Sequence, residues 1–380
     1  MKPNKGFLLV GIITLAILSI FISNSINKTN TDTRSHAVYT NKISFPKDHL
    51  FHSNFKREWW YINLLIRTDD KEIRDTGYVI SLGMADNTYA LLTSKYDDYS
   101  KKFSENTYSP GKISSTLGKS NLFTISYSQD NGPTFTLKEL TPLPNGAKRY
   151  SLKGNSPQTG TLNLTLTEKT VSSKGYNTPL LWGCDGNISV FKPNDTYYYS
   201  IPDLDITGTV KDSNGSIKKV KVGKAWMDHQ WFNSSPNEDP DSTKEEWQGH
   251  YWTDHYLTQR NDFSGPHTAI GAVTQIYNGK PKYSYWVKRN TNGTNECGTN
   301  VEFNIEKIDK KSGYPNLVTI DITNSKKQLI YSGKLLPFNH NQIFKSLGQE
   351  FFEPMSYIMS GTLGKQKVTG LGFFETGIKK

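Results

Sequence analysis

The sequence predicts an exported, all-β protein whose mature part forms two antiparallel, barrel-like halves. Short strand-like stretches recur about every ten residues with turn signals between them, a spacing typical of barrels or sandwiches. Helical periodicity is almost absent along the same chain. The first residues run from basic to apolar to polar, which is the layout of a secretory signal. Together these features set both the fold class and the compartment.

The N-terminal leader starts with Lys2 and Lys5 and continues as an apolar run over residues 7–22. This run of about 16 residues is shorter than the roughly 20 needed to cross a bilayer, which favours a cleaved signal over a permanent anchor. Residues 1–30 are therefore assigned to a signal peptide or N-terminal anchor, through which the chain could associate with a membrane surface. We expect a secreted, periplasmic or cell-surface protein.

The mature chain opens with a predicted hairpin, in which residues 59–67 and 77–84 are strands joined by a polar turn. The second half has the same pattern of short strands separated by turns. Its predicted strands are residues 247–257, 268–277, 283–287, 301–305, 317–322, 329–335 and 365–375. The main helical candidate is the stretch 342–352.

Two domains suit the length of the mature chain, because domains usually contain about 100–200 residues. Residues 233–244 are rich in Asn, Ser, Pro, Asp and Glu and have almost no apolar side chains, so they are interpreted as a linker. We therefore predict an N-terminal domain over residues 36–232 and a C-terminal domain over residues 233–380.

Charge and cysteine content narrow the possible partners. The formal net charge of +10 suits an anionic partner, but the basic residues are scattered and form no block interleaved with aromatics, so nucleic-acid binding is not expected. Cys184 and Cys297 could pair in an oxidising compartment and would then tie the two halves together. Two buried free thiols are the slightly favoured alternative, because a single pair carries no spacing information.

The densest motif is Ala225–Trp231, which contains two Trp, an Asp and a His. In a strand, Trp226 and Asp228 would face one way, and His229 and Trp231 the other. A His beside a Trp can donate a proton while the aromatic ring stabilises a developing cation, which is useful chemistry for protonating an alkene. The alternative is a hydrogen-bonded core His in an aromatic cluster where two domains meet.

A second motif of similar density spans residues 57–61. Glu58 and Trp60 would share one strand face, and Trp59 and Tyr61 the other. Glu58 could be an acid in a cavity, or it could form a salt bridge with its neighbour Arg57 at the start of the strand.

The third dense stretch, residues 246–256, raises the question of a metal site. The possible ligands are Asp228, His229, His250, Asp254 and His255. His250 and His255 are five residues apart and would point to opposite faces of a strand, and no His-Glu-x-x-His or paired-Cys spacing is present. We therefore predict no metal site. Gly-x-Ser-x-Gly and phosphate-loop motifs are also missing from the sequence, which argues against an α/β-hydrolase or an NTPase.

Five sequence stretches, in this order along the chain, carry a family resemblance. They are Glu58–Tyr61, Leu181–Gly186 with Tyr197–Ser200, Ala225–Trp231 and Gly370–Gly377. With these motifs the mature chain resembles the carotenoid 1,2-hydratase/AttH-like family of tandem lipocalin-like proteins, which includes kievitone hydratase-like proteins. The Ala-Trp-Met-Asp-His-x-Trp motif is the specific one.

The resemblance implies two lipocalin-like antiparallel β-barrel domains in tandem, with an apolar ligand pocket near their junction. In the hydratase branch of the family, water is added to an isolated carbon–carbon double bond without a cofactor. The His and Trp implicated there match His229 and Trp231. An aspartate on a later strand is the proton donor of that branch, but its nearest counterpart here, residues 268–275, has no carboxylate. Asp228, Asp254 or Glu58 would then have to serve, with a pKa raised by burial.

The predicted function is cofactor-free hydration of an apolar isoprenoid or phenolic substrate. The predicted catalytic residues are His229, Trp231 and Asp228, and the predicted substrate-binding residues are Glu58, Trp59, Trp60, Tyr61, Trp226, Trp252 and Asp254. The main alternative is a non-catalytic lipocalin-like carrier of a hydrophobic ligand. Hydrolysis is a weaker third possibility, because no nucleophile–base pair is legible in the sequence.

Overall fold

The computed structural model describes residues 42–68, 75–85, 87–98, 100–168, 179–191, 195–233, 247–258, 267–346 and 349–378. These ranges are almost entirely strand, with short 3-10 turns such as η1 (Lys47–His49) and η3 (Trp182–Cys184), which confirms the all-β prediction. The predicted signal (residues 1–30) and nearly all of the predicted linker lie outside the described residues. In the described part, no helix is long and apolar enough to span a membrane.

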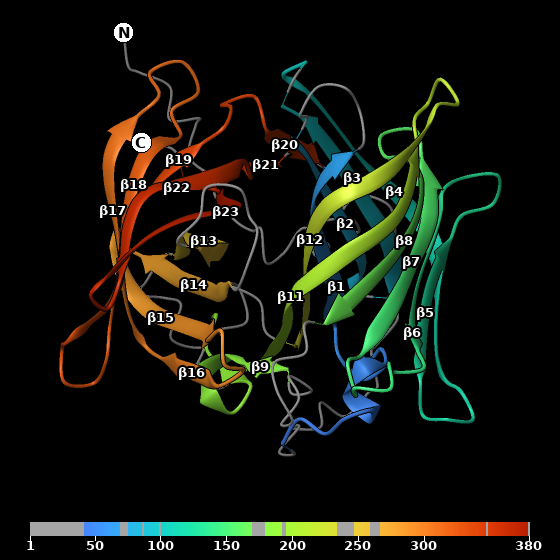
Figure 1. Ribbon diagram of the computed structural model, residues 1–380, viewed down its shortest axis with the longest axis horizontal. Coiled ribbons are helices and arrows are strands. Elements are labelled where there is room, and N and C mark those ends of the chain that lie inside the picture. The colour runs from blue at the N-terminus through green and yellow to red at the C-terminus, as the bar shows by residue number, and fades with distance from the viewer. Residues whose placement is uncertain are drawn as a thin grey trace, which may run out of the picture.

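The first sheet closes into a barrel (Figure 1). Among the described residues its ten barrel strands are β1 (Arg57–Thr68), β2 (Asp75–Ala85), β3 (Thr88–Asp97), β4 (Lys102–Leu117), β5 (Phe123–Ser128), β6 (Thr134–Leu140), β7 (Arg149–Ser156), β8 (Gly160–Glu168), β11 (Thr196–Lys211) and β12 (Ile217–Phe232). β1 and β2 form the predicted hairpin, and pairing of β8 with β11 completes the circle. Two short strands, β9 (Leu180–Leu181) and β10 (Asn187–Ile188), pair with β11.

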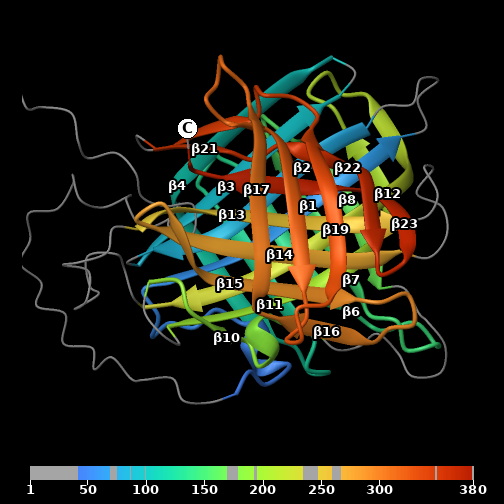
Figure 2. The ribbon, with the colours of Figure 1, turned by 90° about the vertical axis from the view of Figure 1, so that its left-hand side faces the viewer.

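The second sheet curves into a half-barrel and faces the viewer in Figure 2. Its strands are β13 (Trp247–Thr258), β14 (Thr268–Tyr277), β15 (Lys280–Arg289), β16 (Asn295–Gly298), β17 (Asn300–Ile308), β18 (Pro315–Thr323), β19 (Leu329–Pro337), β20 (Ile343–Ser346), β21 (Gln349–Phe352), β22 (Met355–Leu363) and β23 (Gln366–Thr376). The hydrogen-bonded order of the described strands runs from β16 to β17 without closing.

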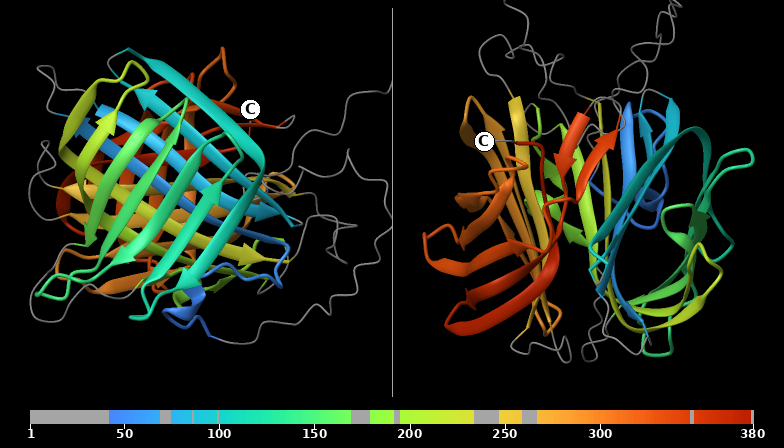
Figure 3. Two further views of the ribbon diagram at one scale, coloured as in Figure 1. Left: turned by 90° about the vertical axis from the view of Figure 1, so that its right-hand side faces the viewer. Right: turned by 90° about the horizontal axis from the view of Figure 1, so that it is seen from above.

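The burial pattern along each strand shows where the two sheets meet. β5 alternates between buried and more exposed residues, because one face lines the barrel and the other faces solvent. β1 and the last ten residues of β12 are buried at every position or nearly so, because their outer faces pack against the second sheet. Figure 3 shows the barrel and the half-barrel side by side along these strands. We call this contact between the sheets the seam.

The predicted helix over residues 342–352 is wrong, because this stretch forms the hairpin of β20 and β21. Phe344 and Phe351 are cross-strand partners, and their rings stack with centroids 4.7 Å apart. Both side chains are buried in the hydrophobic cluster that fills the seam. Burial of this aromatic pair outweighs the weak helical periodicity, since cross-strand aromatic contacts stabilise a sheet.

A disulfide between Cys184 and Cys297 joins the two sheets, so the slightly favoured prediction of two buried free thiols is wrong. Cys184 lies in η3 of the first domain, and Cys297 lies in β16 of the second. Cys184 is exposed rather than buried. The bridge spans 113 residues of sequence, and cross-linking so long a loop restricts the unfolded chain.

Reduction of this bridge is expected to lower the free energy of unfolding by about 2–4 kcal/mol, because the unfolded chain regains the entropy of an open loop. Urea denaturation with and without reductant measures the loss. The matched control is the double variant Cys184→Ser/Cys297→Ser, whose stability should not respond to reductant. A wild-type protein equally indifferent to reductant would contradict this prediction.

Candidate functional site

Neighbouring strands β1 and β12 display two opposite sets of side chains. They pair antiparallel with Trp60 opposite His229 and Tyr61 opposite Asp228. Strand alternation sends Glu58, Trp60, His229 and Trp231 into the barrel, and Trp59, Tyr61, Trp226 and Asp228 into the seam. The predicted division of faces is therefore confirmed, and it yields two separate polar clusters, one on each face.

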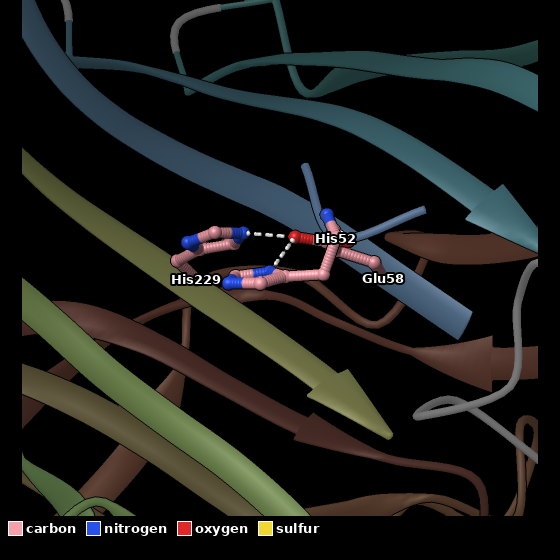
Figure 4. A group of neighbouring side chains, drawn as sticks. All are labelled: His52, Glu58 and His229. Carbon is pink, nitrogen blue, oxygen red and sulfur yellow. Dashed lines mark hydrogen bonds and ion pairs between the residues drawn. The ribbon is translucent and has the colours of Figure 1, made fainter. Parts of the chain in front are cut away.

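The barrel-side cluster centres on the carboxylate of Glu58 (Figure 4). Glu58 Oε1 lies 2.7 Å from His229 Nε2 and 2.8 Å from His52 Nδ1, while Oε2 accepts the backbone N–H of His52 at 2.5 Å. His52 comes from residues 42–56, whose apolar side chains pack onto the barrel interior. One carboxylate thus ties this N-terminal segment to β1 and β12.

The ring nitrogens of His229 and His52 that face away from Glu58 are hydrogen-bonded mainly to one residue, Asp48. His229 Nδ1 lies 3.0 Å from the Asp48 carbonyl oxygen and 3.0 Å from the Tyr199 hydroxyl. His52 Nε2 lies 3.2 Å from the Asp48 carboxylate. The Tyr199 hydroxyl also donates to the Asp48 carbonyl at 3.2 Å. These contacts fix both imidazole rings from behind.

The ionised groups of this cluster are the Glu58 carboxylate and the His52 imidazolium. Burial opposes ionisation of Glu58, but the two imidazoles outweigh it and lower the pKa of the carboxyl. Burial likewise opposes a charged His52, but Glu58 and Asp48 raise its pKa to about 9. Burial lowers the pKa of His229 by more than Glu58 raises it. An ionised Glu58 is poorly suited to donating a proton.

Aromatic rings enclose the cluster. Trp60 stacks on His229 with ring centroids 4.5 Å apart, and Trp231 stacks on His52 at 4.3 Å. His229 and Trp231 lie side by side with centroids 4.9 Å apart, as strand alternation predicts. All these side chains are buried, so the barrel face of β1 and β12 is a packed interior.

The seam-side cluster contains two buried carboxyl groups, of which Asp228 belongs to β12. Its Oδ1 accepts the indole N–H of Trp226 at 2.7 Å and the hydroxyl of Ser200. Burial raises the pKa of Asp228 to about 7, although hydrogen bonds from Ser200, Trp226 and Tyr198 oppose the rise. Tyr198 in turn accepts the indole N–H of Trp252, 3.2 Å across the seam.

The second carboxyl is that of Asp254 on β13, in the other domain. Its Oδ2 accepts the Asn63 amide at 2.9 Å across the seam, and its Oδ1 accepts the Phe373 backbone N–H at 3.0 Å. Burial raises the pKa of Asp254 to about 8, and the charge of Asp228 adds to the rise. A carboxyl with this pKa is largely neutral at pH 7 and can act as an acid.

The seam that contains Asp254 also holds polar atoms without partners. Among the described residues, the hydroxyls of Tyr61 and Tyr256 and the Asn63 amide oxygen are buried with no hydrogen-bond partner. Such atoms are rare in folded proteins and call for an explanation, such as a bound ligand or water. Aromatic rings line the same seam: Tyr61 meets Trp252 at 5.9 Å and Trp226 meets Tyr256 at 6.4 Å, both edge to face. Trp59 is also in the seam and packs edge to face on Phe232.

A cleft opens at one end of the seam. It is small, with a volume of about 20 Å³, and is lined by Leu65, Ile66, Arg67, Val222, Gly223, Lys224 and Leu371. Leu65 follows Asn63 on the same face of β1, and Leu371 is the cross-strand partner of Tyr256. Residues two apart on a strand are separated by roughly 7 Å, so the cleft lies one side chain beyond the Asn63–Asp254 contact.

The strand on which the resemblance places an aspartate is β14, and its residue opposite Asp254 is Gly271. A Cβ atom on Gly271 would lie 3.1 Å from the rings of Trp182 and Trp226. A side chain at this position would therefore require the two tryptophan rings to shift. Asp254, on the neighbouring strand β13, instead places its carboxyl in the seam.

The five possible metal ligands considered in the sequence do not converge. His250 Nε2 contacts Glu375 at 2.7 Å, His255 lies between Thr253 and Ser356, and Asp254 faces Asn63. The sequence interpretation missed His52, Asp48, Tyr199, Asn63 and Tyr256. The spacing of Asp48 and His52, four residues apart and just ahead of Glu58, was the available signal for the barrel-side cluster.

Comparisons with known proteins agree with this architecture. The family model described as AttH-like matches residues 36–377. An AttH protein from Nitrosomonas europaea has a similar crystal structure, with a TM-score of 0.66 and 19% identity over 89% of this chain and 98% of that one. Kievitone hydratase from Nectria haematococca has a TM-score of 0.53 and 14% identity over 90% of this chain and 94% of that one. No curated protein matches the sequence.

Proposed function

The chain belongs to the AttH-like family, and on that premise we propose that it is a hydratase acting at the seam. Its reaction is the addition of water to a carbon–carbon double bond of an apolar isoprenoid or phenolic substrate. The observation that carries the proposal is Asp254, a buried carboxyl with a raised pKa in a seam that also contains unpartnered tyrosine hydroxyls and aromatic rings. The structural likeness to kievitone hydratase supports the same reaction class.

Asp254 supplies the proton in the first step. Its O–H bond breaks, and the alkene π electrons form a new C–H bond, which leaves a cation on the other alkene carbon. The rings of Trp252, Trp226 and Tyr256 belong to the same seam cluster and would stabilise the positive charge. Because the site is buried, this electrostatic stabilisation is stronger than it would be in water.

Water completes the reaction in the second step. The hydroxyls of Tyr61 and Tyr256 would hold a water molecule, which forms the C–O bond and releases a proton to the Asp254 carboxylate. The carboxyl is thereby restored, and the net change is one water added to the substrate. A hydrophobic substrate would reach the seam at the cleft beside Leu65 and Leu371, which would have to widen to admit it.

His229 and Trp231 act as positioning residues in this proposal. They lie on the barrel face of the strand whose opposite face presents Asp228. Their contacts with Glu58, Trp60 and His52 fix β12 against β1, which sets the place of Asp228 and Asn63 in the seam.

Labelled water tests the proposed reaction. Open-chain isoprenoid alkenes, prenylated phenols and kievitone are incubated with the protein in D₂O and, separately, in H₂¹⁸O, with saturated analogues as controls. The expected product carries one deuterium on carbon and one labelled hydroxyl, as detected by mass spectrometry.

A carrier function is the alternative, and it is favoured by the hydrogen bonds that already engage both oxygens of Asp254. If compounds of the panel copurify or bind and are recovered without label, the protein is a carrier and the hydratase proposal is wrong.

Export is part of the proposal. It is supported by the basic–apolar–polar order of residues 1–30 and by the disulfide, a bond that persists in oxidising compartments. N-terminal sequencing of the protein recovered from outside the cytoplasm tests it, since a mature chain beginning beyond residue 22 is expected.

The hydration rate should depend on pH through Asp254. The donor must be neutral, so kcat/KM is expected to stay level below a pH of about 8 and to fall by about tenfold per unit above it. Folding raises the pKa of Asp254 from 3.8 in the unfolded chain to about 8, so the protonated carboxyl favours the folded state. This contribution to stability is fully present below pH 3.8 and is lost as the pH rises through about 8. A rate that increases through this range would contradict Asp254 as the acid.

A further inference from the structure

We propose that His52, Glu58 and His229 form a binding site for a divalent transition-metal ion such as Zn²⁺. The site lies inside the first barrel, on the opposite face of β1 and β12 from the seam, and no step of the proposed hydration passes through it. Among the described residues, these three are the one group of His, Cys, Asp and Glu side chains whose potential ligand atoms converge, all within 4.8 Å of one another. Two imidazoles and a carboxylate are a donor set typical of Zn²⁺ and of non-haem iron.

Each imidazole ring is hydrogen-bonded through one nitrogen, and this orients its other nitrogen toward the Glu58 carboxylate. The Asp48 carbonyl oxygen lies 3.0 Å from His229 Nδ1 and can accept its N–H when the other ring nitrogen binds a metal ion. The Asp48 carboxylate can do the same for Nε2 of His52. The other nitrogens, His229 Nε2 and His52 Nδ1, lie 2.7 Å and 2.8 Å from Glu58 Oε1, and a metal ion would displace the protons that join them to it.

Three potential ligand atoms thus meet at one point, all within 4.8 Å of one another. A single metal ion placed between them would contact all three and replace the protons that now join them in pairs. The anchoring of each outer nitrogen by a carbonyl or a carboxylate is also the support that metal-bound histidines usually have. Ligand atoms around Zn²⁺ are about 3.3 Å apart, so binding requires the hydrogen-bonded atoms to separate by about 0.5 Å.

The three ligands come from separate parts of the fold. His52 lies in the N-terminal segment, Glu58 in β1 and His229 in β12. An ion held by all three would fasten that segment, which packs on the barrel interior, to the two strands that form the seam. Metal binding to the folded protein alone would therefore stabilise it. By contrast, His250 and Glu375 form a pair without a third ligand among the described residues, and they serve as a control.

Cobalt binding tests the site without reference to activity. The full-length, tag-free protein is treated with chelator, dialysed and titrated with Co²⁺, and visible absorption and thermal unfolding are recorded. We expect one Co²⁺ per chain, displaced by Zn²⁺, and a higher Tm in the presence of either ion. His52→Ala and Glu58→Gln should each weaken binding by about tenfold or more. The matched control His250→Ala should bind like the wild type.

Absence of Co²⁺ absorption in the wild type would overturn the proposal and leave a cluster held by protons alone. Binding that persists unchanged in His52→Ala and Glu58→Gln would also overturn it, since the ion would then lie elsewhere. Circular dichroism identifies any variant that does not fold. His52→Gln, which keeps a polar side chain at the edge of the cluster, then replaces His52→Ala. Failure of the hydration assay has no bearing on this result.

Discussion

The Asp254→Asn variant is expected to hydrate its substrate more slowly by a factor on the order of 10²–10⁴, the usual contribution of a general acid. Asn has nearly the same shape and can still accept the Phe373 backbone N–H through its amide oxygen. It carries no acidic proton, so the first step loses its donor while the seam stays intact. Rates of formation of the labelled product, measured for both proteins under the same conditions, give the factor.

Two further variants serve as controls for Asp254→Asn. Asp130 is exposed and pairs with Lys112, so Asp130→Asn should retain the wild-type rate. Asp228→Asn should have a smaller effect than Asp254→Asn, because Asp228 contributes to the pKa of Asp254 but is not itself the donor. Turnover in Asp254→Asn at the wild-type rate would remove Asp254 from the mechanism.

The Trp231→Ala variant is expected to lose about 3–5 kcal/mol of unfolding free energy, the usual cost of removing a large buried aromatic side chain. Trp231 is fully buried, and it stacks on His52 at 4.3 Å and on Tyr197 at 5.6 Å. Its removal leaves a cavity beside a charged imidazole, so the loss combines packing and solvation. Urea denaturation followed by circular dichroism measures the change.

Leu329 provides the control for this effect, because its side chain is 50% exposed in the second sheet. Leu329→Ala should change stability by no more than about 0.5 kcal/mol. A Trp231→Ala variant as stable as this control would show that the barrel interior adapts to the missing ring, contrary to the packed interior described here.

Much of the fold could be predicted from local sequence patterns. Alternation and turn signals located most strands, because each strand needs only its own residues to show a period of two. Strands β1 and β12, which form the seam, contain long runs of buried residues because both of their faces are covered. Pairing of β8 with β11 could not be predicted, because barrel closure joins segments that have no local signal for each other. The β20–β21 hairpin was missed because its stability comes from the distant seam.

The site was predictable only in part, for related reasons. Strand alternation correctly separated His229 and Trp231 from Trp226 and Asp228. It could not show which face lines the barrel and which meets the second domain, because that depends on packing between the sheets. His52 was missed because its segment has no strand periodicity and reaches Glu58 only through the fold. The Cys184–Cys297 pair could not be decided from spacing alone.

The two clusters occupy opposite faces of the same two strands. The hydrogen bonds of Glu58 and His229 fix β1 and β12 from the barrel side, while Asn63 and Asp228 project from these strands toward Asp254. Changes in the barrel-side cluster should therefore alter the seam through the strands rather than by direct contact. Through these strands, residues remote from the proposed proton donor would influence its position.

The proposed reaction requires Asp254 to be a neutral acid in the seam, and titration of this carboxyl shows whether it is. In protein labelled with carbon-13 at the aspartate carboxyls, the resonance that disappears in Asp254→Asn identifies this residue. We expect a titration midpoint at a pH of about 8, so that most of the carboxyl is protonated at neutral pH. A midpoint near the ordinary value of 3.8, with the group ionised throughout the neutral range, would contradict it.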